Sequence, residues 1–140
     1  MPIGWTDDLN RVDGNELAAL FRAAPLGDKA PADLELVFGN SMFRTFAFDA
    51  GILVGAGRAL ADYRDCGYLC DIAVRPSHQG QGLGKEIVTW LVRLCASHRK
   101  IILYAVPGKE PFLGGFWLST HGNGHGDLRK PRQGIGERTS

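Results

Sequence analysis

The segment from His78 to Val88 reads HQGQGLGKEIV and holds three glycines within five residues, followed by a stretch of helical periodicity. Glycine has no side chain to block a ligand, and it readily adopts a positive φ. Backbone N–H groups at a helix N-terminus lack intrahelical partners and lie at the positive end of the helix dipole, so they bind anions. The segment therefore predicts a loop that binds phosphate.

Two common phosphate-binding patterns do not fit this loop. The dinucleotide-binding pattern G-x-G-x-x-G would require a third glycine at Lys85 when counted from Gly80, or at Ile87 when counted from Gly82. A Walker A loop requires Ser or Thr after Gly-Lys, whereas Glu86 follows Lys85. Both failures disfavour a generic nucleotide-binding module.

The residues around the loop predict the elements that position it. Apolar residues at helical spacing follow a cap signal at Asp13 and Glu16, and a turn signal at Asp49–Gly51 separates two strand-like segments. In chain order, the sequence predicts a helix ending near residue 25, a short helix at 32–38, a hairpin at 43–60, a strand at 68–74, a helix from 83 to about 98 and a strand at 101–106. Because the last two strands flank one helix, they should lie parallel in a βαβ unit. The element order is that of an α/β domain.

Composition limits the location and partners of the protein. The chain has 140 residues and a net charge of +1, which predicts one main domain and gives no strong attraction to nucleic acid or membranes. No apolar run reaches the roughly 18 residues of a membrane span, and no signal-peptide pattern is present. The three cysteines, Cys66, Cys70 and Cys95, have irregular spacing, which indicates free thiols. We expect a cytoplasmic protein without nucleic-acid or membrane partners.

The spacing Gln79-x-x-Gly82-x-Gly84, after a strand that ends V-x-P, resembles motif A of the GNAT N-acetyltransferase superfamily. The resemblance covers about Ile3 to Phe112, and motif A is one of the more specific glycine loops. It implies a mixed central sheet with flanking helices, with the parallel βαβ unit around the glycine loop. The alternative is a tight strand-to-helix turn in which the glycines serve packing alone.

The resemblance implies that the ligand is acetyl-CoA. In that family, the backbone N–H groups of the loop surround the coenzyme A pyrophosphate, and the pantetheine arm pairs like an extra strand beside the strand before the loop. Carried over, the residues beside pantetheine would be Asp71, Ile72, Ala73 and Val74. The residues around the phosphates would be Gln79, Gly80, Gln81, Gly82, Leu83, Gly84 and Lys85. His78 could also contact phosphate, or be an exposed turn residue.

The family transfers the acetyl group directly to an amine, with a base that takes a proton and an acid that protonates the departing thiolate. The resemblance makes Asp71 the candidate base or amine-orienting group; the alternative is that Asp71 pairs with a cation or caps a loop. Relatives usually carry a tyrosine acid where this chain has Leu113. The hydroxyl of Tyr104 could partly replace that acid, or Tyr104 could only pack. Cys70 is more typical of a small buried residue than of a nucleophile.

The C-terminal part departs from the family after Phe112. Seven glycines lie between Gly114 and Gly136, and no apolar run follows Leu118, so we expect the terminal strands of the family to be lost. We predict one domain at residues 1–112 and an atypical, poorly ordered, glycine-rich tail at 113–140. His121 and His125 are four residues apart, but intervening glycines disfavour a helix that would align them, so we expect no metal site.

The genetic code offers one explanation of this tail. Codons for residues 116–121, read one base out of frame, permit F-G-F-R-R followed by Met or Thr, which is similar to the ending of relatives. Our hypothesis is that the reading frame changes near residues 113–115, by a natural frameshift or a sequence error. The alternative is a genuinely divergent tail.

These observations predict a GNAT-type N-acetyltransferase that moves an acetyl group from acetyl-CoA to a primary amine, in a ternary complex. The acceptor is expected to be a small molecule. Three aromatic residues could border its pocket: Trp5, Phe43 and Phe46. The alternative is that they pack in the core. The alternative function is a non-catalytic or vestigial acyl-CoA-binding protein. Loss of the terminal strands would expose a sheet edge, which a homodimer could cover.

Overall fold

The computed structural model describes residues 2–103, 117–120 and 126–129, with side chains for the first of these ranges. The strands are β1 (Gly4–Thr6), β2 (Phe43–Asp49), β3 (Ile52–Ala61), β4 (Cys66–Val74), β5 (Lys100–Leu103), β6 (Trp117–Thr120) and β7 (Gly126–Arg129). The α-helices are α1 (Gly14–Ala23), α2 (Pro31–Gly39) and α3 (Leu83–Leu94). Two short 3-10 helices span Leu9–Arg11 and Pro76–His78.

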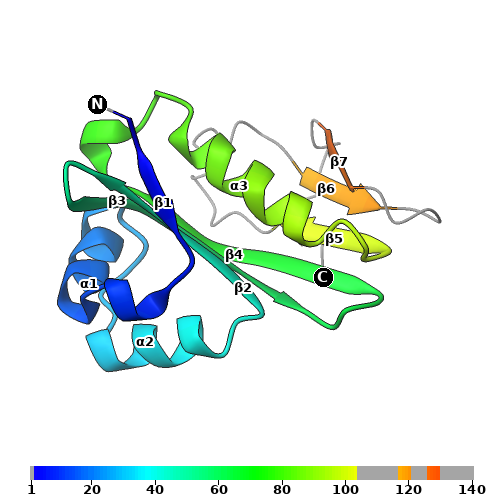
Figure 1. The fold of residues 1–140 in the computed structure, drawn as a ribbon, viewed down its shortest axis with the longest axis horizontal. Coiled ribbons are helices and arrows are strands. Elements are labelled where there is room, and N and C mark those ends of the chain that lie inside the picture. The colour runs from blue at the N-terminus through cyan, green and yellow to red at the C-terminus, as the bar shows by residue number, and fades with distance from the viewer. Residues whose placement is uncertain (1, 104–116, 121–125, 130–140) are drawn as a thin grey trace.

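Five strands form one mixed sheet in the order β1-β2-β3-β4-β5 (Figure 1). The first four pair antiparallel, and β5 pairs parallel to β4. The predicted βαβ unit is therefore confirmed, with α3 as its helix. The fold is therefore the mixed α/β type that the sequence predicts. The connection between two parallel strands must cross over the sheet, and α3 forms this connection between β4 and β5.

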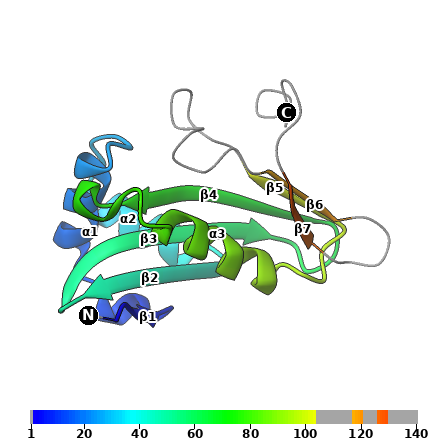
Figure 2. The same cartoon turned by 90° about the horizontal axis from the view of Figure 1, so that it is seen from above.

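The helices cover both faces of the sheet, which makes three layers (Figures 1 and 2). Helices α1 and α2 pack on one face through a cluster that includes Phe21, Phe38 and Phe46, all fully buried. Helix α3 packs on the other face through Ile87 and Leu91. Both cores lie against β3 and β4, so the two strands nearest the glycine loop are held from both sides.

Helix α1 begins as predicted, with the Asp13 side chain accepting a hydrogen bond from the Asn15 N–H at 3.1 Å. The Glu16 side chain does not turn back to complete a capping box. Its Oε2 instead accepts a hydrogen bond from the Leu53 N–H at 2.8 Å, which joins α1 to β3. The sequence signal for the helix start was therefore sound, but the partner of Glu16 lies 37 residues away.

The hairpin between β2 and β3 also forms where it is predicted. Ala50 and Gly51 occupy its turn with φ of 53° and 82°. Two consecutive positive φ values suit the right-handed twist of the flanking strands, and glycine meets this demand without steric cost.

Helix α3 lies close to β3 because glycines face it. A Cβ on Gly57 would lie 2.6 Å from Ile87 Cγ2 and 2.9 Å from Ile72 Cδ1. A Cβ on Gly55 would lie 2.9 Å from Ile87 Cδ1. These positions therefore fix how closely the helix approaches the sheet, and through the helix they fix the glycine loop.

Helix α3 ends at Leu94, four residues before the predicted end at His98. The His98 ring is buried, accepts a hydrogen bond at Nε2 from the Tyr63 N–H at 2.8 Å, and has Nδ1 3.1 Å from the Cys95 carbonyl oxygen. The segment after Leu94 leaves the helix and brings this ring to the β3–β4 turn. Apolar periodicity could not reveal such a contact.

Two further differences concern strands. Strand β1 has no predictive signal in the sequence, because it has only three residues and pairs at the sheet edge with β2. The sequence predicts that the terminal core strands of the family are lost, and within the tail β6 and β7 form an antiparallel pair. They pair with each other and not with the five-stranded sheet. Backbone hydrogen bonding alone defines such a short pair, so it needs no apolar run in the sequence.

Candidate functional site

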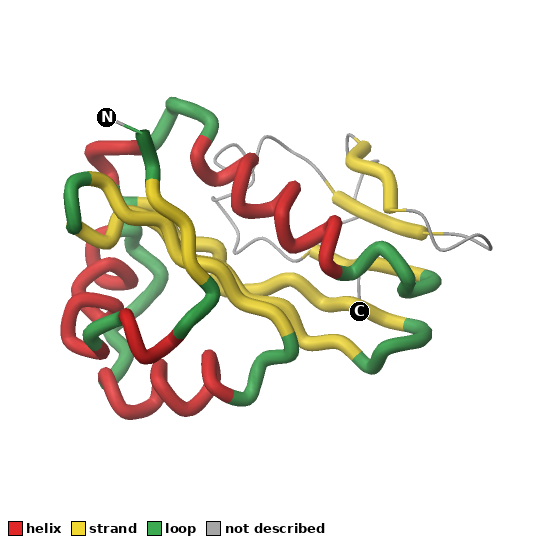
Figure 3. The backbone as a smooth tube through the Cα atoms, viewed as in Figure 1, coloured by secondary structure: helices red, strands yellow, loops and turns green. Residues whose placement is uncertain are grey.

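The glycine loop connects β4 to α3 through the short 3-10 helix at Pro76–His78 (Figure 3). Gly80 and Gly82 have φ of 80° and 86°, in the left-handed region that favours glycine. Gly82 is the N-cap of α3 and supplies no side-chain cap to the first turn of the helix. The N-terminus of α3 therefore has its backbone N–H groups next to two glycines, which have no side chains to cover them.

The space around the glycines separates the two interpretations of the loop. A Cβ on Gly80 or Gly82 would have no atom of the described residues within 4 Å, so neither glycine is there for close packing. Gly84 is buried in α3. The first two positions therefore leave room on the outer side of the loop, whereas Gly84 belongs to the helix–sheet interface.

The two glutamines of the motif hold the loop in shape. The Gln79 Nε2 donates to the Val74 carbonyl oxygen at 2.9 Å, and the Gln81 Nε2 donates to the Ser77 carbonyl oxygen at 3.4 Å. Both side chains thus fold back onto the protein. The backbone groups of these residues are therefore held in place around the loop.

His78 also holds the loop. Its Nε2 lies 2.7 Å from Asp49 Oδ2, and its Nδ1 lies 2.8 Å from Ser77 Oγ. The ring is mostly buried, with 21 % of the side chain exposed, so His78 is not the exposed turn residue weighed from the sequence. It fastens the loop to the β2–β3 turn. The sequence signal was missing because Asp49 lies 29 residues away.

Among the residues that the structure describes, one edge of β4 beside the loop has no partner strand, and this stretch is called the open edge of β4. Strand β5 pairs with β4 only from Cys66 to Leu69, whereas β3 pairs with β4 up to Val74. Among the described residues, no strand pairs with the far side of β4 beyond Leu69. The Arg75 N–H donates to the Val54 carbonyl oxygen on β3 at 2.8 Å. By the alternation of backbone groups along a strand, the N–H of Val74 therefore faces the open edge.

A β-bulge bends β4 at the start of this open edge. Ala56 pairs with Ala73, and Arg58 pairs with Cys70. Between these two pairs, β3 has one residue, Gly57, whereas β4 has two, Asp71 and Ile72. Asp71 has φ of 57°, an uncommon value for a residue with a side chain, although Asp tolerates it better than most. Bulges bend the strand that carries them, and this one lies just beyond Leu69, where the described pairing of β4 with β5 ends. No pattern in the sequence predicts this bulge.

Asp71 lies in an ion pair. Its Oδ2 accepts a hydrogen bond from Arg58 Nε at 2.7 Å, with 24 % and 15 % of the Asp71 and Arg58 side chains exposed. Arg58 Nη1 also donates to Ser41 Oγ at 3.1 Å, and its guanidinium carbon lies 5.9 Å from the centre of the Phe38 ring. The geometry matches the alternative that Asp71 pairs with a cation, and it leaves part of the carboxylate open to solvent.

The surroundings of Cys70 disfavour the reactive form of its thiol. All three cysteines are free, and Cys70 lies beside Asp71 on β4. Burial raises the pKa of the Cys70 thiol, although the nearby Arg58 opposes this. Because the thiolate is the reactive form, the raised pKa disfavours Cys70 as a nucleophile at neutral pH.

The remaining sequence candidates fall into two groups. Phe46 is fully buried and Phe43 packs against the core. Trp5 is 41 % exposed and lines a groove between β1 and α3. The other candidates lie outside the described residues: Tyr104, Leu113, His121 and His125. The described residues contain no group of three or more His, Cys, Asp or Glu that could hold a metal ion. None of the described helices is long and apolar enough to cross a membrane.

Solved structures share this fold. A Staphylococcus aureus protein of unknown function that is thought to be an acetyltransferase superposes with a TM-score of 0.69 at 24% identity, covering 79% of this chain and 84% of that one. A GNAT family acetyltransferase from Streptococcus pneumoniae gives 0.64 at 21% identity, covering 79% of both chains. A third structure is a diaminobutyrate acetyltransferase from Paenibacillus lautus in complex with L-2,4-diaminobutyric acid and coenzyme A. It superposes with a TM-score of 0.64 at 23% identity, covering 81% of this chain and 74% of that one.

The sequence comparison is more specific than the fold. No curated protein sequence matches the chain significantly. The family model of the GNAT acetyltransferases matches residues 14–111, which include the open edge of β4, the glycine loop and α3. The match spans well over half of the chain, and we conclude that this protein belongs to the GNAT acetyltransferase family.

Proposed function

We propose that this chain is an N-acetyltransferase that transfers the acetyl group of acetyl-CoA to a primary amine of a small molecule. The observation that carries the proposal is the juxtaposition of the open β4 edge with the outward-facing, left-handed glycines of the loop. An extended pantetheine arm needs backbone partners along a strand, and a pyrophosphate needs N–H groups at a helix N-terminus. These two features follow each other along the chain, since the loop comes directly after the end of β4.

The residues of this chain fit acetyl-CoA as a substrate. Ile72, Ala73 and Val74 would lie along the pantetheine arm, and the Val74 N–H would face it. The backbone of the loop would hold the phosphates, with contributions from the following residues: Gln79, Gly80, Gln81, Gly82, Leu83, Gly84 and Lys85. The open space at Gly80 and Gly82 supports this assignment, because no described atom of the protein occupies it.

The proposed reaction is a direct acyl transfer. The amine nitrogen attacks the thioester carbonyl carbon, a new C–N bond forms, and the C–S bond breaks. The attacking amine loses one proton to a base, and the departing thiolate gains one proton from an acid. In this proposal, backbone N–H groups of β4 would stabilise negative charge on the carbonyl oxygen. The acetylated amine and coenzyme A are the products.

Asp71 is the proposed group that orients the amine. Its carboxylate is partly exposed and lies at the bulge that opens the β4 edge, and Arg58 fixes its position. An ammonium or amine donor could hydrogen-bond to this carboxylate while Arg58 stays in place. Tyr104 remains the proposed donor of a proton to the thiolate, because Leu113 has no proton to give.

The proposed class of acceptor rests on the chemistry of the reaction and on one similar solved structure. The similar enzyme from Paenibacillus lautus was solved with a diamine acid and coenzyme A. That likeness supports a small-molecule amine and does not select one. A second candidate function is a non-catalytic acyl-CoA-binding protein. The ion pair of Asp71 with Arg58 favours it, because the pair occupies one oxygen of the only carboxylate proposed at the reaction centre.

Release of coenzyme A thiol from acetyl-CoA, in the presence of a panel of primary amines, tests the proposal. We expect release that depends on the amine and rises with pH as the amine loses its proton. Mass spectrometry of the products should show one added acetyl group on the amine. Acetyl-CoA binding without amine-dependent release, across diamines, amino sugars and amino acids, would support the non-catalytic alternative instead.

A further inference from the structure

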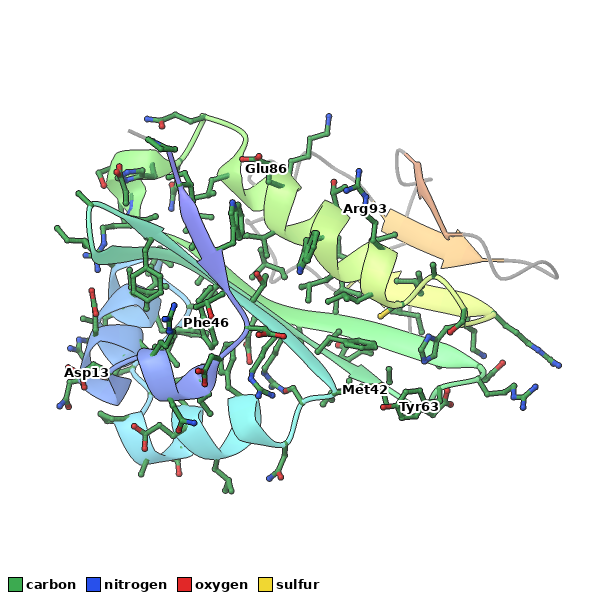
Figure 4. All side chains as sticks on the ribbon, viewed as in Figure 1. Asp13, Met42, Phe46, Tyr63, Glu86 and Arg93 are labelled. Atoms are coloured by element: carbon green, nitrogen blue, oxygen red, sulfur yellow. The ribbon has the colours of Figure 1, made fainter. Side chains whose placement is uncertain are left out.

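A second guanidinium group lies near the ion pair of Asp71 with Arg58. Arg44 on β2 pairs directly opposite Arg58 on β3, so both side chains leave the sheet on the face where α2 packs. Arg58 Nη1 donates to Ser41 Oγ at 3.1 Å, and Arg44 Nη1 donates to the Ser41 carbonyl oxygen at 3.5 Å. Figure 4 shows Met42, the next residue along the chain, where α2 leads into β2. The two arginines therefore meet at this connection.

Ser41 holds Arg58 in place. Only 4 % of Ser41 is exposed, and its hydroxyl donates to the Val37 carbonyl oxygen at 2.7 Å while it accepts the bond from Arg58. Arg58 is thus fastened at two nitrogens, Nε on Asp71 and Nη1 on Ser41. Its third nitrogen, Nη2, donates to no residue that the structure describes. A guanidinium group with a fixed orientation therefore keeps one nitrogen for a ligand.

The charges of this cluster do not balance. In the described part of the chain, the hydrogen bonds of Arg44 all go to backbone carbonyl oxygens, those of Asp7, Phe38 and Ser41. Arg44 forms no ion pair with any described carboxylate, and the described partner of Arg58 is Asp71. Two guanidinium groups therefore share one carboxylate. Because like charges at directly opposite positions of a sheet repel each other, a bound anion would stabilise the cluster.

We propose that the acceptor carries an acidic group, a carboxylate or a phosphate, close to the amine that is acetylated. The inference rests on the proposed function, because it names the class of acceptor for the same reaction. The amine lies at the Asp71 carboxylate, and the acidic group lies at Arg58 Nη2 and the Arg44 guanidinium.

The contact between Asp71 and Arg58 sets the spacing of the two acceptor groups. Because Asp71 Oδ2 lies 2.7 Å from Arg58 Nε, groups that bind to both side chains are separated by only a few bonds. The charges of such an acceptor align antiparallel to those of the ion pair, so each charge of the acceptor faces an opposite charge of the protein. An amine without an acidic group would leave the second guanidinium without an anion.

Kinetics with matched acceptors test the inference. Each amine is supplied in an acidic and a neutral form: glycine with glycinamide, β-alanine with β-alaninamide, and phosphoethanolamine with ethanolamine. Release of coenzyme A from acetyl-CoA gives kcat/KM, which is expressed per unprotonated amine because the basicities of the amines differ. We expect the acidic form to exceed the neutral form by about tenfold to a hundredfold in at least one pair, as for one hydrogen bond to a charged group. The pair with the larger preference distinguishes carboxylate from phosphate.

Two variants test the arginines separately. Arg58→Lys keeps a positive charge for Asp71 but loses the guanidinium fork that binds two groups at once. Arg44→Gln removes the second charge and does not touch Asp71. In each variant, the preference for the acidic form should fall at least about fivefold, mainly through a higher KM for that form. A purely structural role would lower kcat/KM for both forms equally.

Arg93→Gln is the matched control. It removes the same charge from an exposed position on α3, which packs on the other face of the sheet (Figure 4). Its preference between the acidic and neutral forms should equal that of wild type. Circular dichroism and thermal melting of each variant establish that the compared proteins are folded.

The outcomes separate this inference from the proposed function. If wild type acetylates neutral amines as efficiently as the acidic ones, the inference is overturned and the proposed function stands. The same holds if Arg58→Lys and Arg44→Gln both retain the wild-type preference. If no amine of these pairs or of the wider panel is acetylated, the proposed function fails and this inference fails with it.

Discussion

At the scale of single residues, Asp71 combines two costly features. Its backbone is left-handed, and its carboxylate is paired with an arginine that is mostly buried. Such features persist only where the surrounding structure stabilises them, and they occur often at functional sites. Their position at the start of the open β4 edge gives this residue its importance.

Removing the charge of Asp71 should destabilise the protein. Asn tolerates the same left-handed φ, so Asp71→Asn isolates the loss of charge that leaves Arg58 without its partner. We expect the free energy of unfolding to fall by about 1–3 kcal/mol. Urea unfolding measures this. Asp65→Asn is the control, because Asp65 pairs with Lys100 at an exposed position and should change stability by less than about 1 kcal/mol. Equal effects of the two changes would contradict the role given to the Asp71 pair.

The thiols give a second prediction at this scale. Burial raises the pKa of Cys95 to about 11, with a smaller contribution from Cys66. At pH 8, Cys95 is therefore almost entirely protonated as well as enclosed, and we expect iodoacetamide to modify Cys66 first in the folded protein. Cys95 should react only after unfolding. Peptide mass spectrometry after timed labelling measures this, and early modification of Cys95 would contradict its buried position.

At the scale of elements, the sequence revealed those that rest on periodicity and local turn chemistry. The α1 cap at Asp13, the positive φ at Gly51, and the parallel β4–α3–β5 unit all follow from neighbours in the chain. The Asp71 bulge and the His78–Asp49 contact could not be predicted in the same way. Each depends on a residue of a distant strand or turn, and a single sequence does not report such pairs.

Because α3 packs closely on β3, we expect that one methyl group added between them lowers the stability of the fold. Gly57→Ala places a Cβ against Ile87, Ile72 and Leu91, and we expect a loss of about 1–3 kcal/mol from overpacking. Gly4→Ala is the control, because its nearest neighbour would be the Phe48 carbonyl oxygen at 3.9 Å. Thermal or urea unfolding compares them. If Gly57→Ala is as stable as Gly4→Ala, α3 is not held at this distance.

The β3–β4 turn predicts a dependence of stability on pH. Hydrogen bonds from the N–H groups of Arg64, Asp65 and Cys66 lower the pKa of Asp62 from 3.8 to about 2. A folded pKa below the unfolded one stabilises the fold above pH 3.8, and this stabilisation is lost as the pH falls toward 2. Asp62→Asn should therefore lower the melting temperature at pH 6 and lose less on acidification to pH 2. Parallel melting curves for both proteins would contradict this role.

At the scale of the whole molecule, the family assignment rests on residues 14–111 and the tail lies beyond them. The extent of the domain, the order of the tail and the homodimer expected from an exposed sheet edge remain predictions. The sequence identified the family because its glycine loop is specific. It could not identify the acceptor, because no short pattern encodes a pocket assembled from distant elements.

The frameshift hypothesis gives a prediction about the tail. If the reading frame changes near residues 113–115, a chain that continues in the alternative frame should melt at a higher temperature than this one, because it would supply the terminal strands of the family. Thermal melting of both chains measures this. Resequencing that finds synonymous codons incompatible with the alternative frame would contradict the hypothesis.

The central claim is that the outward-facing glycines of the loop bind the phosphates of acetyl-CoA. Gly82 and Gly51 have nearly the same φ, 86° and 82°, and a Cβ on either would meet no described atom within 4 Å. Alanine at either position therefore carries the same backbone strain, about 1 kcal/mol, but only Gly82 lies in the loop.

The most direct measurement is calorimetric titration of wild type, Gly82→Ala and Gly51→Ala with acetyl-CoA. We predict that wild type and Gly51→Ala bind with equal affinity and that Gly82→Ala binds at least about tenfold more weakly, which corresponds to roughly 1.4 kcal/mol. Failure of folded wild type to bind acetyl-CoA, or equal binding by all three proteins, would contradict the account.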